Sequence, residues 1–271
     1  MTLTDILKIV GYGVPFILHS VGFVLLYKAK EELLPNQRLI TMNLAVTETL
    51  YCMGQVLFHT LEVADLLPTV VNIILEFFLA SCFCAIRFAV LHIIVDRFLD
   101  IWLNIKYPIY VNKKKILIAI GMQWIFGFCF GLIESLIWHF EDIDITLLKD
   151  VLLDVIVIVT AFVTNIYFFR TIMSMIQPTL SNTTDGRPDK RRVLLKLKIP
   201  CLMVLTFIIF NAASTILLYV AEKLDLPEQV FLAHDILDIF GWCSDALIYV
   251  LLQKRVRHKL VSICKGRFRN N

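Results

Sequence analysis

The sequence PTVVNIILEFFLASCFCAIRFAVLHIIVD, residues 68–96, decides how the rest of the chain is interpreted. It is longer than the about 20 mostly apolar residues that an α-helix needs to cross the hydrocarbon core of a membrane. Backbone groups in lipid must form hydrogen bonds within their own segment, so a long apolar run of this kind is helical. The stretch therefore predicts one membrane-spanning helix.

Six further stretches have the same character. They cover residues of about 6–29, 38–61, 115–140, 147–173, 194–221 and 230–252. Of the 271 residues, 58% are hydrophobic and 18% are charged, against roughly 25% charged residues in an average soluble domain. The alternation typical of a membrane β-barrel is absent from the sequence. These features exclude a disordered chain and predict an all-α membrane protein, a seven-transmembrane helix bundle formed by a single domain over residues 1–271.

The basic residues predict the orientation of this bundle. Nearly all of the 26 Lys and Arg residues fall in alternate loops and in the C-terminal stretch, and only Lys8, Lys149 and Lys223 fall in the loops of the other side. Loops rich in Lys and Arg face the cytoplasm, so we expect a multi-pass plasma-membrane protein with an extracellular N-terminus. The basic face would attract anionic membrane lipids, which leaves no reason to invoke nucleic acid. No cleavable signal peptide is expected, because Met1–Asp5 lacks a basic region.

Two polar segments complete the predicted organisation. Residues 177–190 form an inner linker between the fifth and sixth spans, and residues 253–271 form a basic cytoplasmic tail. Cys264 lies in this tail, about a dozen residues after the last span. A cysteine close to the membrane in a basic stretch is a candidate for palmitoylation.

The sequence DRFLDIWLNIKYP, Asp96–Pro108, closes the third span. It resembles the D/E-R-Y/F motif and the following inner loop of rhodopsin-like (class A) G-protein-coupled receptors. Asn43–Glu48 is similar to the N-L-A-x-x-D motif of that family, and Asp245–Tyr249 is similar to its N/D-P-x-x-Y motif. Single residues and the tail also match, namely Trp124 in span four, Tyr167 in span five and Gln253–Gly266 as a short amphipathic eighth helix. The resemblance covers essentially the whole chain and implies the same seven-helix fold, with Asn43 and Trp124 in structural positions.

The chain also departs from the family pattern. Glu48 stands in place of an Asp, Ala246 in place of the span-seven Pro, and Val159 in place of a span-five Pro. Span six lacks the C-W-x-P motif, and Asn72 stands where the cysteine of the outer disulfide would be. The resemblance is therefore to a divergent member of the family.

The resemblance implies a G-protein coupling switch at the inner face. An Arg97 guanidinium at the membrane edge needs a partner, and Asp96 is its neighbour, so we expect an ion pair that holds the receptor inactive. The alternative is a purely structural pair at the interface. The expected coupling residues are Asp96, Arg97, Tyr107, Pro108, Tyr167, Asp245 and Tyr249.

Three ionisable residues near the middle of their spans form a predicted buried ion cluster. The resemblance implies that Glu48 and Asp245 face each other, where the family often holds a sodium ion. Arg87 lies ten residues before Arg97 on the same helix, and a buried guanidinium needs a carboxylate partner. We hypothesise that Arg87 pairs with Glu48, Asp245 or both in place of sodium, with Asp154 as the rival partner.

A ligand pocket is expected in the outer half of the bundle, between spans three, five, six and seven. Its candidate residues are Glu76, Leu79, Phe83, Asp154, His234, Asp235 and Asp238. Glu76, Asp235 and Asp238 make the mouth of this pocket acidic, which would suit a cationic ligand or a basic peptide. The alternative is that these three are solvated groups at the outer helix ends. By the resemblance, Leu79 stands where amine receptors carry an Asp, and Ile239 stands where opsins carry the retinal-binding Lys.

These observations favour a receptor that binds an unknown extracellular ligand and activates a heterotrimeric G protein by helix rearrangement. One alternative is a seven-helix transporter or channel that uses Glu48, Arg87 and Asp245. Another is a receptor-like membrane protein that does not signal. No enzyme, cofactor or metal is expected, because the sequence lacks H-E-x-x-H, G-x-S-x-G, P-loop and paired-Cys motifs.

Overall fold

A computed structural model describes residues 3–28, 35–103, 106–141, 146–176, 202, 205–224, 226–251 and 261. These residues form helices joined by short turns, and none of them lies in a β-strand, which confirms the predicted all-α class. The predicted linker 177–190, the tail 253–271 with its eighth helix, and Cys264 lie outside the described residues, apart from the isolated Val261. The side chain of Tyr249 also lies outside them.

The described helices follow most of the predicted spans, but residues 194–201 and 203–204 of the sixth span lie outside the described residues. Their bounds are α1 (Leu3–Lys28), α2 (Pro35–Val63), α3 (Thr69–Leu103), the short α4 (Tyr107–Tyr110), α5 (Lys113–Glu141), α6 (Thr146–Ile176), the π-helix η2 (Phe207–Ala212), α8 (Ala213–Lys223) and α9 (Glu228–Leu251). Turn residues separate them. Asp65 adopts a positive φ of 53° after α2, and the Asn112 side chain accepts a hydrogen bond from the Lys115 backbone N–H at 3.0 Å, as a helix N-cap does.

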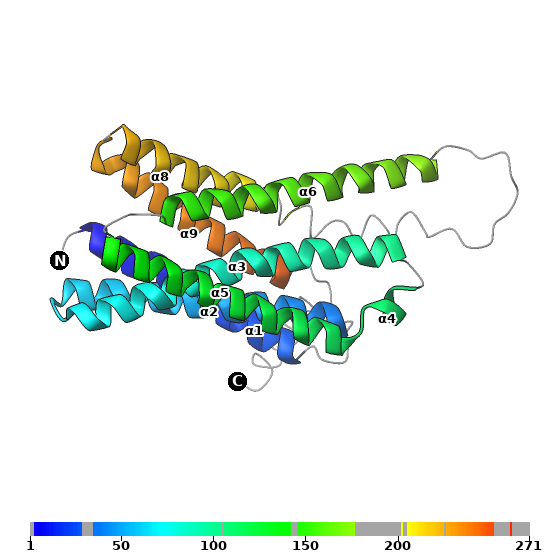
Figure 1. The fold of residues 1–271 in the computed structure, drawn as a ribbon, viewed down its shortest axis with the longest axis horizontal. Coiled ribbons are helices and arrows are strands. Elements are labelled where there is room, and N and C mark those ends of the chain that lie inside the picture. Colours follow the sequence, from blue (N-terminus) through cyan, green and yellow to red (C-terminus); the bar gives the residue numbers. More distant parts are fainter. Residues whose placement is uncertain are drawn as a thin grey trace, which may run out of the picture.

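Successive long helices run in opposite directions (Figure 1), with α3 between a group formed by α1, α2 and α5 and a group formed by α6 and α8. The start of α1, the turn between α2 and α3 and the turn between α8 and α9 therefore share one end of the molecule, called here the N-terminal end. Helix α4 and the last turns of α3 and α6 lie at the opposite end.

Three helices are long and apolar enough to cross a membrane within the described part of the chain. They are Thr4–Lys28, Thr69–Leu103 and Lys113–Ile137, with mean hydropathies of 1.9, 2.2 and 2.2. Val151–Tyr167 and Phe207–Ala221 are shorter apolar helices. The chain is thus an all-α protein with membrane-compatible helices, and the count of seven spans stays a prediction.

Helices α3 and α5 approach each other closely at two glycines. A Cβ built on Gly127 would lie 2.9 Å from the backbone oxygen of Ser81, and one built on Gly131 would collide with the Ser81 side chain. The absence of side chains at these positions lets the two backbones come together.

A buried hydrogen-bond network joins α2, α3 and α5. The Trp124 indole N–H donates to Asn43 Oδ1 at 3.0 Å, and the Asn43 amide donates to Gln123 Oε1 at 3.1 Å. Gln123 donates in turn to the backbone oxygen of Ala85 at 2.8 Å. Asn43 and Trp124, predicted to be structural, are therefore direct partners, which fixes how the three helices are rotated against each other.

Candidate functional site

The end of α3 carries the predicted switch. Arg97 Nη2 lies 2.9 Å from Asp96 Oδ2, and the Arg97 side chain is 12% exposed. Its other terminal nitrogen lies 3.9 Å from Asp100. The Tyr107 hydroxyl donates a hydrogen bond to the second oxygen of Asp96. The predicted ion pair is confirmed, and Asp96 is held from both sides.

Helix α4 positions Tyr107 for this contact. Pro108 occupies the first turn of the helix, a position that suits its fixed φ and missing N–H. The Asn36 side chain donates to the backbone oxygen of Val111 at 2.8 Å and so ties the end of α4 to the start of α2. Burial raises the pKa of the Tyr107 hydroxyl, and the neighbouring Asp96 carboxylate raises that pKa further, so the hydroxyl stays protonated and available as a donor.

Tyr167 of α6 reaches the same end of α3. Its ring meets the ring of Phe98 edge to face, with centroids 5.0 Å apart. Phe98 stacks in turn on Trp102, with centroids 6.1 Å apart. The structure therefore gathers five of the predicted coupling residues around the end of α3, namely Asp96, Arg97, Tyr107, Pro108 and Tyr167. Asp245 instead lies deeper in the molecule, where the Thr206 hydroxyl donates to it at 3.4 Å.

Arg87 lies at the centre of a second polar site. Its Nε is 2.8 Å from Asp154 Oδ1 of α6, and both side chains are at most 5% exposed. Phe83, Phe207 and Trp242 surround the guanidinium, with ring centroids 4.1, 5.0 and 5.9 Å from its central carbon. The hypothesis that Arg87 pairs with Glu48 or Asp245 is wrong, because α3 turns Arg87 toward α6 and its rival partner Asp154.

The Arg87–Asp154 pair is extended into η2 and α8. Thr215 donates to the second oxygen of Asp154 at 2.9 Å, and Arg87 Nη1 donates to Asn211 Oδ1 at 3.4 Å. One buried cluster therefore links α3 and α6 to the continuous segment formed by η2 and α8, three parts of the chain that are far apart in the sequence. Sequence reasoning missed Asn211 and Thr215 as members, since a polar residue in an apolar span gives no sign of which neighbour it faces.

Glu48 has a partner that the sequence did not single out. His19 Nδ1 of α1 lies 2.9 Å from Glu48 Oε2, and both side chains are fully buried. Glu48, Arg87 and Asp245 are all buried as predicted. They contact different partners, however: Glu48 contacts His19, Arg87 contacts Asp154 and Asp245 contacts Thr206. The only available signal for His19 was an ionisable residue in the middle of an apolar run.

The predicted ligand-pocket residues separate into three groups. Phe83 and Asp154 contact Arg87, and Asp238 accepts a hydrogen bond from the Trp242 indole at 3.1 Å beside them. Glu76 accepts one from Asn72 of its own helix at 2.7 Å, and Leu79 packs against the apolar core. The structure therefore does not gather all seven residues in one pocket.

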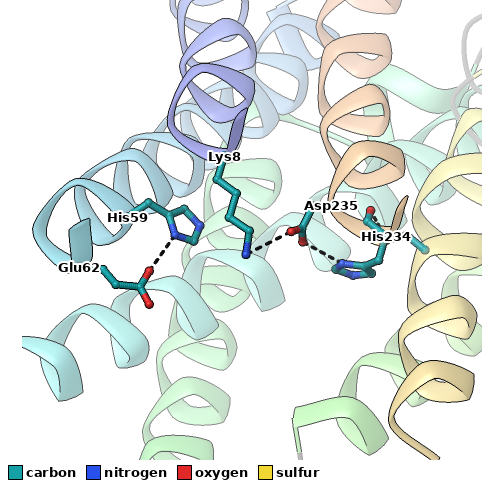
Figure 2. Close-up of polar contacts among 6 residues, drawn as sticks. Lys8, His59, Glu62, His234 and Asp235 are labelled. Carbon is teal, nitrogen blue, oxygen red and sulfur yellow. Dashed lines mark hydrogen bonds and ion pairs between the residues drawn. The ribbon is translucent and has the colours of Figure 1, made fainter. Parts of the chain in front are cut away.

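The third group lies at the N-terminal end, where α1, α2 and α9 meet (Figure 2). Lys8 Nζ lies 3.2 Å from Asp235 Oδ2, and His234 Nδ1 lies 3.1 Å from the other oxygen of Asp235. His59 pairs separately with Glu62 at 3.2 Å. Lys8, absent from the predicted pocket, thus forms an ion pair between α1 and α9.

No group of three or more His, Cys, Asp or Glu side chains is arranged to hold a metal ion in the part of the chain that the structure describes. Comparison of the chain with protein-family models and with curated proteins gave no match.

Proposed function

We propose that the chain is a divergent seven-transmembrane receptor of the rhodopsin-like type, which binds an extracellular ligand and activates a heterotrimeric G protein. The observation that carries the proposal is the end of α3, where Asp96 holds Arg97 at 2.9 Å and Tyr107 holds Asp96. A charged pair at a helix end, restrained by a separate short helix, is a contact that a binding partner can open.

The burial of the ionisable residues of α2 and α9 supports seven membrane passes. Helices α2 and α9 are 29 and 24 residues long, enough to span a bilayer. Their ionisable residues lower their hydropathy, but Glu48, Asp238 and Asp245 are buried, while exposed positions include Leu57, Ile236, Phe240 and Leu247. Ionisable side chains that point into a protein interior are the form in which charge is tolerated within a membrane.

The orientation is supported by the charge at the opposite end of the molecule. Lys113, Lys114 and Lys115 open α5 close to Arg97 in the sequence and lie at the end that holds α4. Lys and Arg in short loops mark the cytoplasmic side. Arg97 would therefore face the cytoplasm, and the N-terminal end would face the exterior of the cell.

The Arg87 cluster provides a route between the two faces. A ligand that contacts Phe83 or Asp238 would alter the packing around the guanidinium, which is tied to both α6 and η2. A shift in the relative stability of two arrangements of these helices is sufficient for signalling. The arrangement that frees Arg97 from Asp96 would be the one that binds the G protein.

The test is G-protein dissociation measured by resonance energy transfer in cells, at matched surface expression. We expect Arg97→Ala to abolish coupling, and Tyr107→Phe to raise basal activity because it removes the hydroxyl that holds Asp96. Lys114→Ala, an exposed basic residue at the same end, is the matched control and should couple normally.

Two outcomes would contradict the proposal. Failure of the unmutated protein to dissociate any class of G protein would favour a receptor-like protein that does not signal. Ion or solute flux that survives Arg97→Ala but is lost with Arg87→Met would favour the transporter or channel, which the buried charges of α2, α3 and α6 also suit.

A further inference from the structure

Five ionisable side chains from three helices meet at the N-terminal end of the molecule (Figure 2). They are Lys8 of α1, His59 and Glu62 of α2, and His234 and Asp235 of α9, and this group is called here the histidine rim. Each imidazole lies beside a carboxylate, with His59 Nδ1 3.2 Å from Glu62 and His234 Nδ1 3.1 Å from Asp235. None of the five side chains is fully buried, so protons from the surrounding water reach them.

The two histidines are the groups of the rim that respond to a change of pH near neutrality. Histidine is the residue type whose ordinary charge change falls in this range. Lysine ordinarily keeps its proton well above neutral pH, and aspartate and glutamate ordinarily lose theirs well below it. Acidification of the medium therefore adds positive charge to the rim at two positions, one on α2 and one on α9.

His59 faces Lys8 from the side of α2. The Tyr12 ring of α1 stacks on the His59 imidazole, with centroids 6.0 Å apart. Lys8 lies one turn before Tyr12 on the same face of α1, since residues four positions apart are neighbours on a helix surface. The Lys8 side chain therefore extends past the His59 ring, as Figure 2 shows. A protonated His59 repels the Lys8 ammonium, and Glu62 is the carboxylate that partly offsets this repulsion.

His234 acts on the same ion pair from the side of α9. One oxygen of Asp235 lies 3.2 Å from Lys8 Nζ, and the other lies 3.1 Å from His234 Nδ1. A protonated His234 therefore competes with Lys8 for this carboxylate. The other described groups that face His234 are Asp238, one turn further along α9, and Ser214 of α8, which donates to the His234 backbone oxygen at 3.4 Å. Both histidines, once charged, weaken the attachment of Lys8 to α9.

We propose that the histidine rim is a proton-binding site, through which acidification of the extracellular medium releases Lys8 from Asp235 and loosens the N-terminal end of α1 from α9. Charging of histidines at an interface is a known form of switch. The inference rests on the proposed function, in which this end faces the exterior, and it names the proton as a ligand of the receptor. Asp238 accepts a hydrogen bond from Trp242, whose ring lies 5.9 Å from the Arg87 guanidinium carbon, so a movement of α9 at the rim reaches the Arg87 cluster.

The test is hydrogen–deuterium exchange of the full chain in phosphatidylcholine nanodiscs, at about pH 7.5 and about pH 5.5, on either side of the ordinary histidine range. Mass spectrometry locates the exchanged amides, and each rate is divided by that of an unfolded peptide at the same pH, which removes the intrinsic pH dependence of exchange. We expect residues 3–12 to exchange about fivefold faster at the lower pH, as the loss of an ion pair of about 1 kcal/mol implies.

Three variants separate the rim from a general effect of acid. The double variant His59→Gln, His234→Gln keeps neutral hydrogen-bonding side chains but removes both proton sites, so the pH difference should disappear. His92→Gln is the matched control and should keep the full difference, because His92 lies one turn before Asp96, toward the opposite end of α3. Lys8→Met, a second test on a separate residue, should exchange fast at both pH values. A thermal unfolding midpoint for each variant shows that it is folded.

Equal exchange at both pH values in the unmutated protein, or a pH difference that survives in the double histidine variant, would overturn the proton site. G-protein dissociation is measured at the same two pH values. A rise at the lower pH that the double variant lacks would support the proton as a ligand of the receptor, and coupling that does not change with pH would overturn that role. A pH difference in exchange without any G-protein coupling would support the proton site and contradict only the proposed signalling.

Discussion

Within the described residues, helices α1, α2, α3 and α5 pack on one another through apolar side chains and close glycine contacts, whereas α6, η2 and α8 meet α3 both through apolar side chains and at the buried Arg87 cluster. In the first group, glycines bring the backbones together and the network of Asn43, Gln123 and Trp124 is neutral. In the second group, the central contact is a buried guanidinium and carboxylate.

The difference lies in how the two groups respond to the loss of one partner. Apolar packing is lost in proportion to the atoms removed, while a buried ion pair leaves an uncompensated charge when half of it is removed. The first group is therefore expected to serve as a fixed frame. The second group is attached to that frame by the Arg87–Asp154 ion pair, which is either formed or broken, with a large difference in stability between the two.

The largest effect is expected from Asp154→Ala, which leaves the Arg87 guanidinium buried without its carboxylate. Breaking a buried ion pair in this way costs about 3–5 kcal/mol, measured as a lower thermal unfolding midpoint of the purified protein. The double variant Arg87→Met, Asp154→Leu removes both charges and should unfold close to the unmutated protein. An equal decrease in the unfolding midpoint of the single and the double variant would show that the charges do not hold the two groups of helices together.

A smaller loss is expected within the frame from Gly131→Ala, because the added carbon meets the Ser81 side chain and backbone of α3. Overpacking of this kind costs about 1–3 kcal/mol. Gly121 is the control on the same helix, since a side-chain carbon there meets nothing within 4 Å. Gly121→Ala should raise the free energy of unfolding by about 0.5–1 kcal/mol, and the unfolding midpoint with it. A lower midpoint in both variants would argue against close α3–α5 packing.

The smallest effect concerns sodium, which should leave the unfolding midpoint of the unmutated protein unchanged. The imidazole of His19 already lies 2.9 Å from Glu48 in the frame, and it occupies the side of the carboxylate that a sodium ion would have to approach. Unfolding is compared in sodium chloride and in choline chloride at equal ionic strength. A higher unfolding midpoint in sodium chloride than in choline chloride would show that a sodium ion, and not His19, is the partner of the Glu48 carboxylate.

Much of the helix layout was predictable because apolar run length is a local property. The predicted stretches 6–29, 38–61, 115–140 and 147–173 fall within or overlap α1, α2, α5 and α6. The third helix continues to Leu103, seven residues beyond the predicted end at Asp96. The Asp96–Arg97 pair was predictable for the same reason, since adjacent residues need no knowledge of tertiary structure.

The partners of the buried charges were not predictable because they depend on how each helix is rotated and tilted. Arg87 had Glu48, Asp245 and Asp154 as candidates, and only the packed structure selects Asp154. The pairs that His19 and Lys8 form were not predicted, because both residues lie on α1 and their partners depend on how α1 packs on α2 and α9.

The π-helix η2 has a geometric consequence for the helix on either side of it. Thr206 reaches Asp245 of α9 and Thr215 reaches Asp154 of α6, and in an uninterrupted α-helix residues nine positions apart point in opposite directions, about 180° from each other. The wider turn winds in one additional residue, which reduces that angle to about 80°. Both hydroxyls can therefore point inward, and deleting one residue between 207 and 212 would return the segment to a regular α-helix with the two threonines eight positions apart, at the same angle of about 80°.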